Sequence, residues 1–128
     1  MEQKFYKCDH CGNILIPLID AGVTPFCCGE AMRLLKPGTV EAAAEKHIPV
    51  IERDSDGKHL KVNVGSAPHP MTDEHYIEFI VLMFNNRVGT AVLHPGDEPK
   101  AEYIIDDNHI PIKAYAYCNL HGLWEANV

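Results

Sequence analysis

Four of the five cysteines in this chain lie within its first 28 residues, as Cys8-x-x-Cys11 and the adjacent pair Cys27-Cys28. Four thiolates so close in sequence can surround one tetrahedral ion, and zinc and iron both accept that donor set. A disulfide between Cys27 and Cys28 would strain the peptide that joins them. The segment has too few large apolar residues to fold by burial alone, so we expect metal binding to fold it.

The fifth cysteine, Cys118, stands alone, three residues before His121. Several imidazoles with one thiolate suit iron, copper or zinc, and a thiolate donates electron density to a redox metal. The pair therefore indicates a second metal site of different chemistry. Prolines beside further candidate ligands stiffen their loops; these candidates are His47, His69 and His75.

The residues alone do not choose among these histidines. His94-Pro95 repeats the local sequence of His69-Pro70, and His109-Ile110-Pro111 repeats that of His47-Ile48-Pro49. A histidine on a loop is more often a solvated polar residue than a ligand, and this is the interpretation we favour for His10 and His59.

Charge and hydropathy exclude several classes of function. The net charge is −7, with 11 Lys and Arg against 18 Asp and Glu, and the scattered basic residues predict no nucleic-acid partner. The longest apolar run, Tyr76 to Phe84, is far shorter than the ~20 residues needed to span a bilayer, so no membrane association is expected. No signal peptide is read before Cys8, and the odd number of cysteines fits a reducing cytoplasm.

The chain reads as two parts joined by the turn segment Lys36-Pro37-Gly38-Thr39. Val40 to Lys46 has weak helix propensity. Beyond it, apolar residues recur with a period of two, which predicts short antiparallel strands in an all-β sandwich of about 90 residues. The expected strands are Leu60–Val64, Tyr76–Phe84, Val88–Leu93, Tyr103–Ile105 and Ile112–Cys118, with Asn85-Asn86 as a two-residue hairpin turn.

Five motifs, in order, resemble the desulfoferrodoxin family, the two-iron form of superoxide reductase. They are C-x-x-C-G-N from Cys8, C-C-G-E from Cys27, E-K-H-I-P-V from Glu45, P-H-P-M from Pro68 with a histidine six residues after His69, and Y-C-N-L-H-G-L-W from Tyr117. Each motif is modest alone, but the ordered set covers nearly the whole chain and is highly specific.

The resemblance implies a mainly β protein with a desulforedoxin- or rubredoxin-like domain at residues 1–36 and an immunoglobulin-like antiparallel sandwich at 37–128. It implies two iron ions per chain. One would be Fe(Cys)4 at Cys8, Cys11, Cys27 and Cys28; the other would be Fe(His)4Cys at His47, His69, His75, His121 and Cys118. Glu45 and Lys46 match the family's glutamate and lysine beside the first histidine ligand, where lysine would steer the substrate and glutamate would bind the ferric ion.

The activity implied by the resemblance is one-electron reduction of superoxide to hydrogen peroxide. It would occur at an open sixth position of a ferrous centre, in a cytoplasmic homodimer that receives electrons from a rubredoxin-type donor. Two alternatives from other classes are a non-catalytic, zinc-ribbon-like interaction module and a simple electron carrier. Colour distinguishes them, because a zinc module is colourless and an Fe(Cys)4 carrier is red, whereas a ferric His4Cys centre adds a blue-green band.

Overall fold

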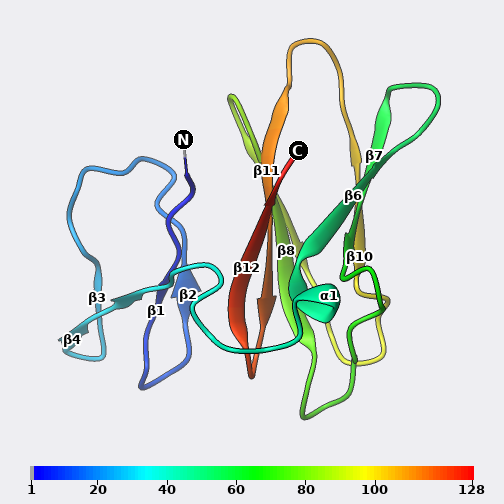
Figure 1. Cartoon of the computed structure of the whole chain (residues 1–128). Helices are drawn as coiled ribbons and strands as arrows, with labels where there is room; N and C mark the ends of the chain where they lie inside the picture. The colour runs from blue at the N-terminus through cyan, green and yellow to red at the C-terminus, as the bar shows by residue number, and fades with distance from the viewer. Residues whose placement is uncertain (1) are drawn as a thin grey trace. The chain divides into compact units, whose positions relative to one another are not determined.

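The computed structural model describes residues 2–128 and divides the chain into two compact units, Met1–Lys36 and Pro37–Val128. Each unit is built from short antiparallel strands (Figure 1). The division falls within the Pro-Gly turn segment that follows the cysteine-rich part of the sequence.

The first unit has very little regular structure. Its strands are two residues long and pair as β2-β1-β5 and β3-β4; they are β1 (Tyr6–Lys7), β2 (Ile14–Leu15), β3 (Phe26–Cys27), β4 (Glu30–Ala31) and β5 (Arg33–Leu34). The buried side chains are few: Phe5, Tyr6, Cys8, Met32 and Leu35. One of these few is itself a cysteine of the cluster, so the small core adjoins the thiolate site on one side, while Cys11 and Cys28 are exposed.

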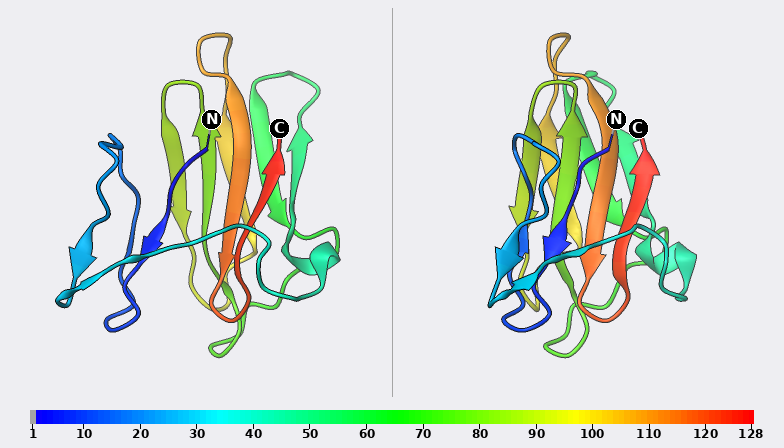
Figure 2. Two further views of the ribbon diagram at one scale, coloured as in Figure 1. Left: turned by 60° about the vertical axis from the view of Figure 1, so that its left-hand side comes forward. Right: turned by 90° about the vertical axis from the view of Figure 1, so that its left-hand side faces the viewer.

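The second unit is a sandwich of two antiparallel sheets (Figures 1 and 2). One sheet has the order β10-β7-β6, with β6 (Pro49–Arg53), β7 (His59–Val64) and β10 (Lys100–Ile104). The other has the order β12-β11-β8-β9, with β8 (Ile77–Phe84), β9 (Val88–Val92), β11 (Pro111–Cys118) and β12 (Gly122–Asn127). A single helical turn, α1 (Ala44–His47), precedes β6.

The core between the two sheets follows the period of two. On β7, Leu60, Val62 and Val64 are buried while the residues between them are more exposed, as alternating side chains require. The facing sheet contributes further buried residues, among them Ile80, Leu82, Ala114, Ala116 and Cys118. Cys118 is therefore part of the sandwich core as well as the last residue of β11.

The mainly β fold class expected from the sequence is confirmed, with differences at particular elements. Strands β6 and β12 were not predicted, and the helix is shorter than Val40–Lys46 because it begins only at Ala44. No side chain caps it at Ala43, and Ile48 already has extended backbone geometry. The hairpin turn at Asn85-Asn86 is confirmed by the register, since Met83 pairs with Val88 and Phe84 N–H donates to the Arg87 carbonyl over 2.9 Å.

One end of the sandwich gathers the connections that carry the candidate ligands. The β11–β12 turn, α1 and the β7–β8 connection lie together at this end, and the β8–β9 and β10–β11 connections lie at the opposite end (Figures 1 and 2). Across residues 2–128, no helix has the length and apolar character needed to cross a membrane.

Candidate metal centres

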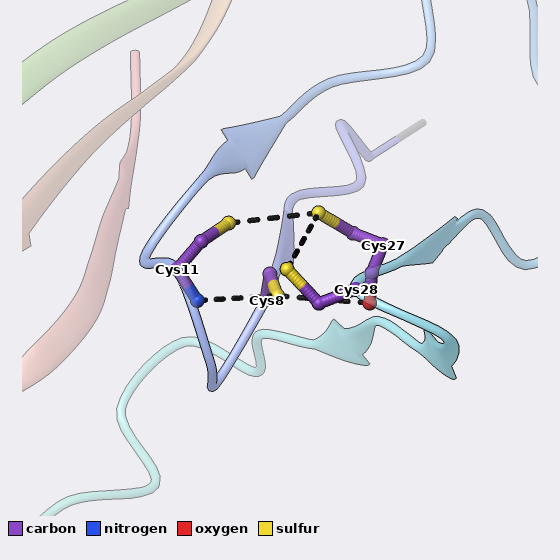
Figure 3. A group of neighbouring side chains, drawn as sticks. All are labelled: Cys8, Cys11, Cys27 and Cys28. Carbon is purple, nitrogen blue, oxygen red and sulfur yellow. Dashed lines mark hydrogen bonds between the residues drawn. The ribbon is translucent and has the colours of Figure 1, made fainter.

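The four cysteines of the first unit converge on one point (Figure 3). Their sulfur atoms all lie within 4.8 Å of one another. Cys11 Sγ is 3.6 Å from Cys27 Sγ, which is 4.0 Å from Cys28 Sγ. These separations exceed the ~2.05 Å of a disulfide and agree with the edge of roughly 3.8 Å expected for a tetrahedron with metal–sulfur bonds of about 2.3 Å. The cluster therefore fits a single four-thiolate metal ion.

Tight turns bring the cysteines to this point. Gly12 N–H donates to the Cys8 carbonyl over 2.9 Å, and Cys11 N–H points at Cys8 Sγ over 3.5 Å. Gly12 has a φ of 83°, which glycine adopts without strain. Cys28, with a φ of 53°, is the non-glycine residue in the described part of the chain with a positive φ. That strained backbone is what places adjacent cysteines on one ion.

The thiols of this cluster require a cation to ionise together. The backbone N–H of Cys11 holds the pKa of Cys8 at about 6. Hydrogen bonding with the Cys11 and Cys8 thiols, together with burial, raises the pKa of Cys27 to about 12, because these effects favour the protonated thiol. A bound metal ion removes this conflict by ligating every sulfur as thiolate.

The second unit brings four imidazoles into a square. Neighbouring ring centroids are 4.7 Å apart for His47 and His69, 4.6 Å for His69 and His75, 5.1 Å for His75 and His121, and 4.9 Å for His121 and His47. The diagonal between His47 and His75 is longer, at 6.4 Å. His47 Nε2 lies 3.2 Å from both His69 Nε2 and His121 Nδ1. Nitrogens about 2.1 Å from a central metal would lie roughly 3 Å from their neighbours in a square, which matches these contacts.

Backbone carbonyls fix the tautomers of the two buried rings. His47 Nδ1–H donates to the Ala43 carbonyl over 2.7 Å, and His69 Nδ1–H donates to the Pro70 carbonyl over 2.7 Å. In a neutral ring, Nε2 then carries a lone pair and no proton. The 3.2 Å contact between these two Nε2 atoms is consequently not a hydrogen bond, and a shared cation accounts for it.

Burial disfavours the charged form of two of these histidines. It lowers the pKa of His69 to about 4 and also lowers the pKa of His75. His75 Nε2 is buried, and among residues 2–128 it has no hydrogen-bond partner. A buried imidazole nitrogen without a partner is costly unless it ligates a metal, so this orphaned atom supports a metal in the square.

Cys118 supplies a sulfur beside the imidazoles. It is fully buried, and its Sγ lies 3.8 Å from His121 Nδ1. Burial raises the pKa of the Cys118 thiol, while backbone N–H groups of Leu120 and His121 oppose that shift. The ligand atoms of Cys118, His47, His75 and His121 lie within 4.8 Å of one another, with His69 joined through its contact with His47. The donor set is therefore four imidazoles and one thiolate.

Glu45 and Lys46 lie on α1, directly before His47, and both are exposed. The Glu45 carbonyl accepts hydrogen bonds from Ala67 N–H at 3.1 Å and Ser66 Oγ–H at 3.3 Å. The positive charge of Lys46 is the smallest of the causes that lower the pKa of His75, after burial and the charges of His121 and His47. The backbone here is held against the β7–β8 connection, while the two side chains reach solvent.

Comparison with known proteins shows the family. The model of the Desulfoferrodoxin family matches residues 39–127. Desulfoferrodoxin from Nitratidesulfovibrio vulgaris is 46% identical over 125 residues, covering 98% of this chain and 96% of the relative. The chain belongs to the desulfoferrodoxin family. The crystal structure of superoxide reductase from Treponema pallidum superimposes with a TM-score of 0.81 at 31% identity, covering 98% of both chains. Superoxide reductase from Pyrococcus abyssi is 37% identical over 99 residues, 66% of this chain and 86% of that protein.

The remaining four histidines do not converge with Cys118, and one of them, His10, lies within the Cys8-x-x-Cys11 turn of the first unit. Each has an acidic or polar neighbour: His10 with Glu30 at 3.0 Å, His59 with Asp56 at 2.7 Å, His94 with Asp97 at 3.6 Å, and His109 with Asp106, Asn86 and Arg87. The structure therefore separates the four histidines that converge with Cys118 from the four that do not.

Trp124 is a supporting residue that the ligand motifs did not single out. Its indole stacks on His47 with centroids 5.1 Å apart, and its Nε1–H donates to the His121 carbonyl over 3.1 Å. It therefore contacts two imidazole-bearing segments that are far apart in sequence. The signal for it lay in the motif Y-C-N-L-H-G-L-W, in which the single tryptophan of the chain follows the ligands.

Proposed function

We propose that this chain is a superoxide reductase with iron at both sites. The reaction consumes one superoxide, one electron and two protons and gives one hydrogen peroxide. The observation that carries this proposal is the square of four imidazoles with the buried sulfur of Cys118, in a member of the desulfoferrodoxin family. A histidine-only zinc or copper site would have no need of that thiolate.

The protein supplies five donors, which leaves one position of an octahedral ion for substrate. Ferrous iron bound there would supply the single electron to superoxide. The thiolate of Cys118 would donate electron density toward the ion, and the sandwich core shields the Cys118 side chain from solvent. His75 and His121 are only half-buried, so they form the side of the site that faces solvent. Water at this exposed side would supply the two protons, and the same side would let the product leave.

Local charge recruits an anion to an acidic protein. The chain carries a net charge of −7, but a divalent ion at this site would keep a positive charge, because imidazole ligands add none and one thiolate would cancel only half of it. Lys46 adds a positive charge whose effect reaches His75. Screening acts over roughly 8 to 10 Å, so the charges close to the site have more influence there than the net charge of the whole chain. We assign Lys46 the role of steering superoxide, and Glu45 the role of a carboxylate ligand available to the ferric state.

The four-cysteine cluster of the first unit would hold the other iron ion and would transfer one electron at a time. A rubredoxin-type protein is the proposed donor, and the reducing cytoplasm is the proposed compartment. We also propose a homodimer. Exposed apolar side chains of the first unit support it, namely Leu18, Ile19, Val23 and Phe26 at 81%, 87%, 77% and 72% exposure.

The test is a stoichiometric reaction of the full-length, ascorbate-reduced protein with a measured pulse of superoxide. A reductase gives one peroxide per superoxide and evolves no oxygen, and its oxidation produces a blue-green thiolate-to-iron band. A dismutase gives half as much peroxide together with oxygen. A colourless zinc protein, or a red protein without the second band and without peroxide formation, would contradict the proposal in favour of an interaction module or an electron carrier.

A further inference from the structure

The side chain of Asn119 takes the place of a backbone hydrogen bond that is missing beside the second metal site. Asn119 follows the last residue of β11, and its backbone N–H donates to the Tyr76 carbonyl over 3.2 Å. The reciprocal bond of an antiparallel pair would run from Tyr76 N–H to the Asn119 carbonyl. Instead, Tyr76 N–H donates to the side-chain Oδ1 of Asn119 over 3.0 Å. The side chain thus takes the place of the main-chain acceptor.

This substitution releases the backbone to turn directly after Cys118. Residues 119–121 form the turn, and β12 begins at Gly122 with a φ of 77°. The turn returns His121 to within 3.8 Å of the Cys118 sulfur. A hydrogen bond from Tyr76 N–H to the Asn119 carbonyl would have continued β11 beyond Cys118. His121 would then lie farther from the Cys118 sulfur, because successive residues of a strand advance about 3.3 Å.

The same side chain also holds the segment that carries His75. Asn119 Nδ2–H donates to the Glu74 carbonyl over 2.9 Å, while Oδ1 receives the N–H of Tyr76. Both chain neighbours of His75 are therefore bonded to one amide group. Three of the five proposed ligands, Cys118, His121 and His75, depend on this residue for their relative placement.

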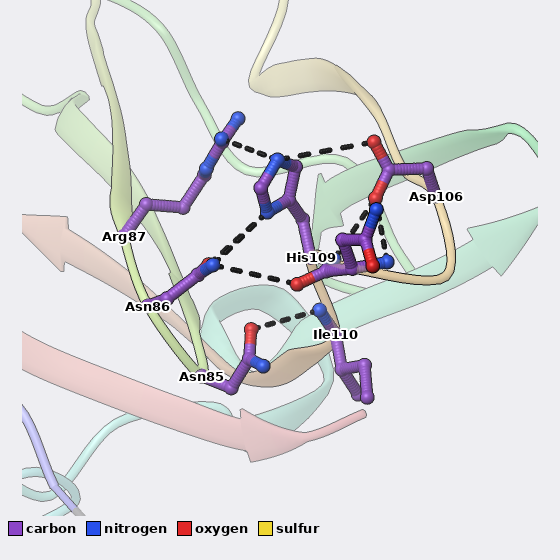
Figure 4. A network of polar contacts seen from close by, with 7 residues as sticks. Asn85, Asn86, Arg87, Asp106, His109 and Ile110 are labelled. Atoms are coloured by element: carbon purple, nitrogen blue, oxygen red, sulfur yellow. Dashed lines mark hydrogen bonds and ion pairs between the residues drawn. The ribbon is translucent and has the colours of Figure 1, made fainter.

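The opposite end of the same strand pair has a matching bridge (Figure 4). Asn85 N–H donates to the Ile110 carbonyl over 2.9 Å, and Ile110 N–H donates to Asn85 Oδ1 over 3.0 Å. Asn85 follows β8 and Ile110 precedes β11, so the two bridges are separated by an eight-residue strand, roughly 26 Å. Asn85 has the same bonding pattern with Ile110 but lies near no proposed ligand.

We propose that Asn119 is a positioning residue of the imidazole–thiolate centre, and that its side-chain amide sets how firmly the metal is held. The proposal rests on the ligand set assigned above and not on the superoxide chemistry. Residues that orient metal ligands typically change metal affinity about 10- to 100-fold when they are replaced. A residue that only tied two loops together would change stability without selectively changing metal retention.

The experiment compares Asn119→Ala with Asn85→Ala in the full-length, iron-loaded protein. The readouts are the rate at which excess EDTA removes iron from the second site, followed by the blue-green band of the oxidised protein, and the thermal unfolding midpoint. Iron in the four-cysteine site of the same molecule serves as the internal reference. We expect Asn119→Ala to lose iron about 10- to 100-fold faster than wild type and to shift the band, whereas Asn85→Ala stays near wild type.

Asn119→Asp provides the second variant if Asn119→Ala does not fold. Its carboxylate keeps an acceptor for Tyr76 N–H but cannot donate to the Glu74 carbonyl, so intermediate retention is expected. Equal iron loss from the variants at Asn119 and Asn85, or an unchanged band and rate in the Asn119 variants, would overturn the proposal. Wild-type protein that binds no metal at the second site would instead overturn the ligand assignment on which the proposed function stands.

Discussion

Gly65 lies so close to the backbone of Glu45 that a side chain at this position has no room. A Cβ built on Gly65 would lie 2.6 Å from the Glu45 carbonyl oxygen and 2.7 Å from the Lys46 Cα. Gly65 also has a φ of 83° and donates its N–H to the Ile48 carbonyl over 3.2 Å. The backbones of the β7–β8 connection and of α1 are therefore in contact at this glycine. The contact lies shortly before His69 in the first segment and before His47 in the second.

Gly65→Ala is expected to displace the segment that carries Glu45, Lys46 and His47. The strain of the positive φ costs about 1–2 kcal/mol, and the backbone collision adds roughly 1–3 kcal/mol. Gly57→Ala is the matched control, because Gly57 has a φ of 70° and nothing within 4 Å of its Cβ position. Chemical denaturation and the visible spectrum of the second site measure both effects. Equal destabilisation of the two variants, with unchanged spectra, would show that the contact at Gly65 is unimportant.

Cys118→Ser is expected to abolish superoxide reduction while the four-cysteine site keeps its iron. A serine hydroxyl does not replace a thiolate as a donor to a redox metal, and the two sites share no ligand. Iron content, the visible spectrum and turnover with superoxide check this result. Wild-type turnover in the variant would show that the thiolate is not needed.

Cys28→Ser is the complementary variant, aimed at the first site. It should remove the iron of the first unit and unfold that unit, whose core is small. The reaction of the pre-reduced second site with superoxide should remain near the wild-type rate. Loss of that reaction, with the sandwich folded and its iron retained, would make the first site obligatory for catalysis.

Lys46→Ile tests electrostatic steering. Removing an exposed positive charge beside the site should slow the second-order reaction with superoxide and flatten its dependence on ionic strength. Lys58→Ile makes the same change in net charge on the distant β6–β7 hairpin and should leave the rate nearly unaltered. The measurement is the rate of oxidation of reduced protein over a range of salt concentrations. Equal rates and salt slopes in the two variants would leave Lys46 as an ordinary solvated charge.

The sequence predicted the strands whose pattern is set by burial on one face. β7 and β8 have clear apolar patterns and were expected within one residue of their observed bounds. β6 begins at a proline, and Val50-Ile51-Glu52-Arg53 does not alternate, so its pairing with β7 depends on the sheet around it. The alanines before α1 favour a helix locally, but one turn is all that the connection to β6 allows.

Single residues and their immediate neighbours predicted the candidate site less well than the ordered set of family motifs did. Two proline-flanked histidines, His94 and His109, had the same local sequence as proposed ligands, and only the match to family motifs separated them. For His109 the fold provides the physical distinction, because His69 lies at the end of the sandwich where Cys118 lies and His109 lies at the other end, among Asn86 and Arg87 (Figure 4). His94 is instead exposed beside Asp97 and does not join the group around Cys118. The bridge made by Asn119 could not be foreseen, because it depends on a strand pairing between residues 43 positions apart.

Glu45 is expected to matter in one oxidation state only. Its carbonyl is held by two hydrogen bonds from the β7–β8 connection, while its carboxylate is exposed two residues before His47. A carboxylate is a hard donor that prefers ferric to ferrous iron, so we expect that Glu45 would bind an iron ion at the second site in its ferric state and not in its ferrous state.

Glu45→Ala should therefore shift the blue-green band of the oxidised protein, because water or hydroxide would take the place of the carboxylate. The band should then acquire a new dependence on pH, from ionisation of that water. The first reaction of the reduced protein with superoxide should change little, since the carboxylate is not a ligand of the ferrous state. Glu41→Ala, on the exposed segment before α1, is the matched control for the loss of one negative charge. If oxidised wild type and Glu45→Ala have the same spectrum across the pH range, Glu45 does not bind the ferric ion, and its exposure on α1 reflects only solvation.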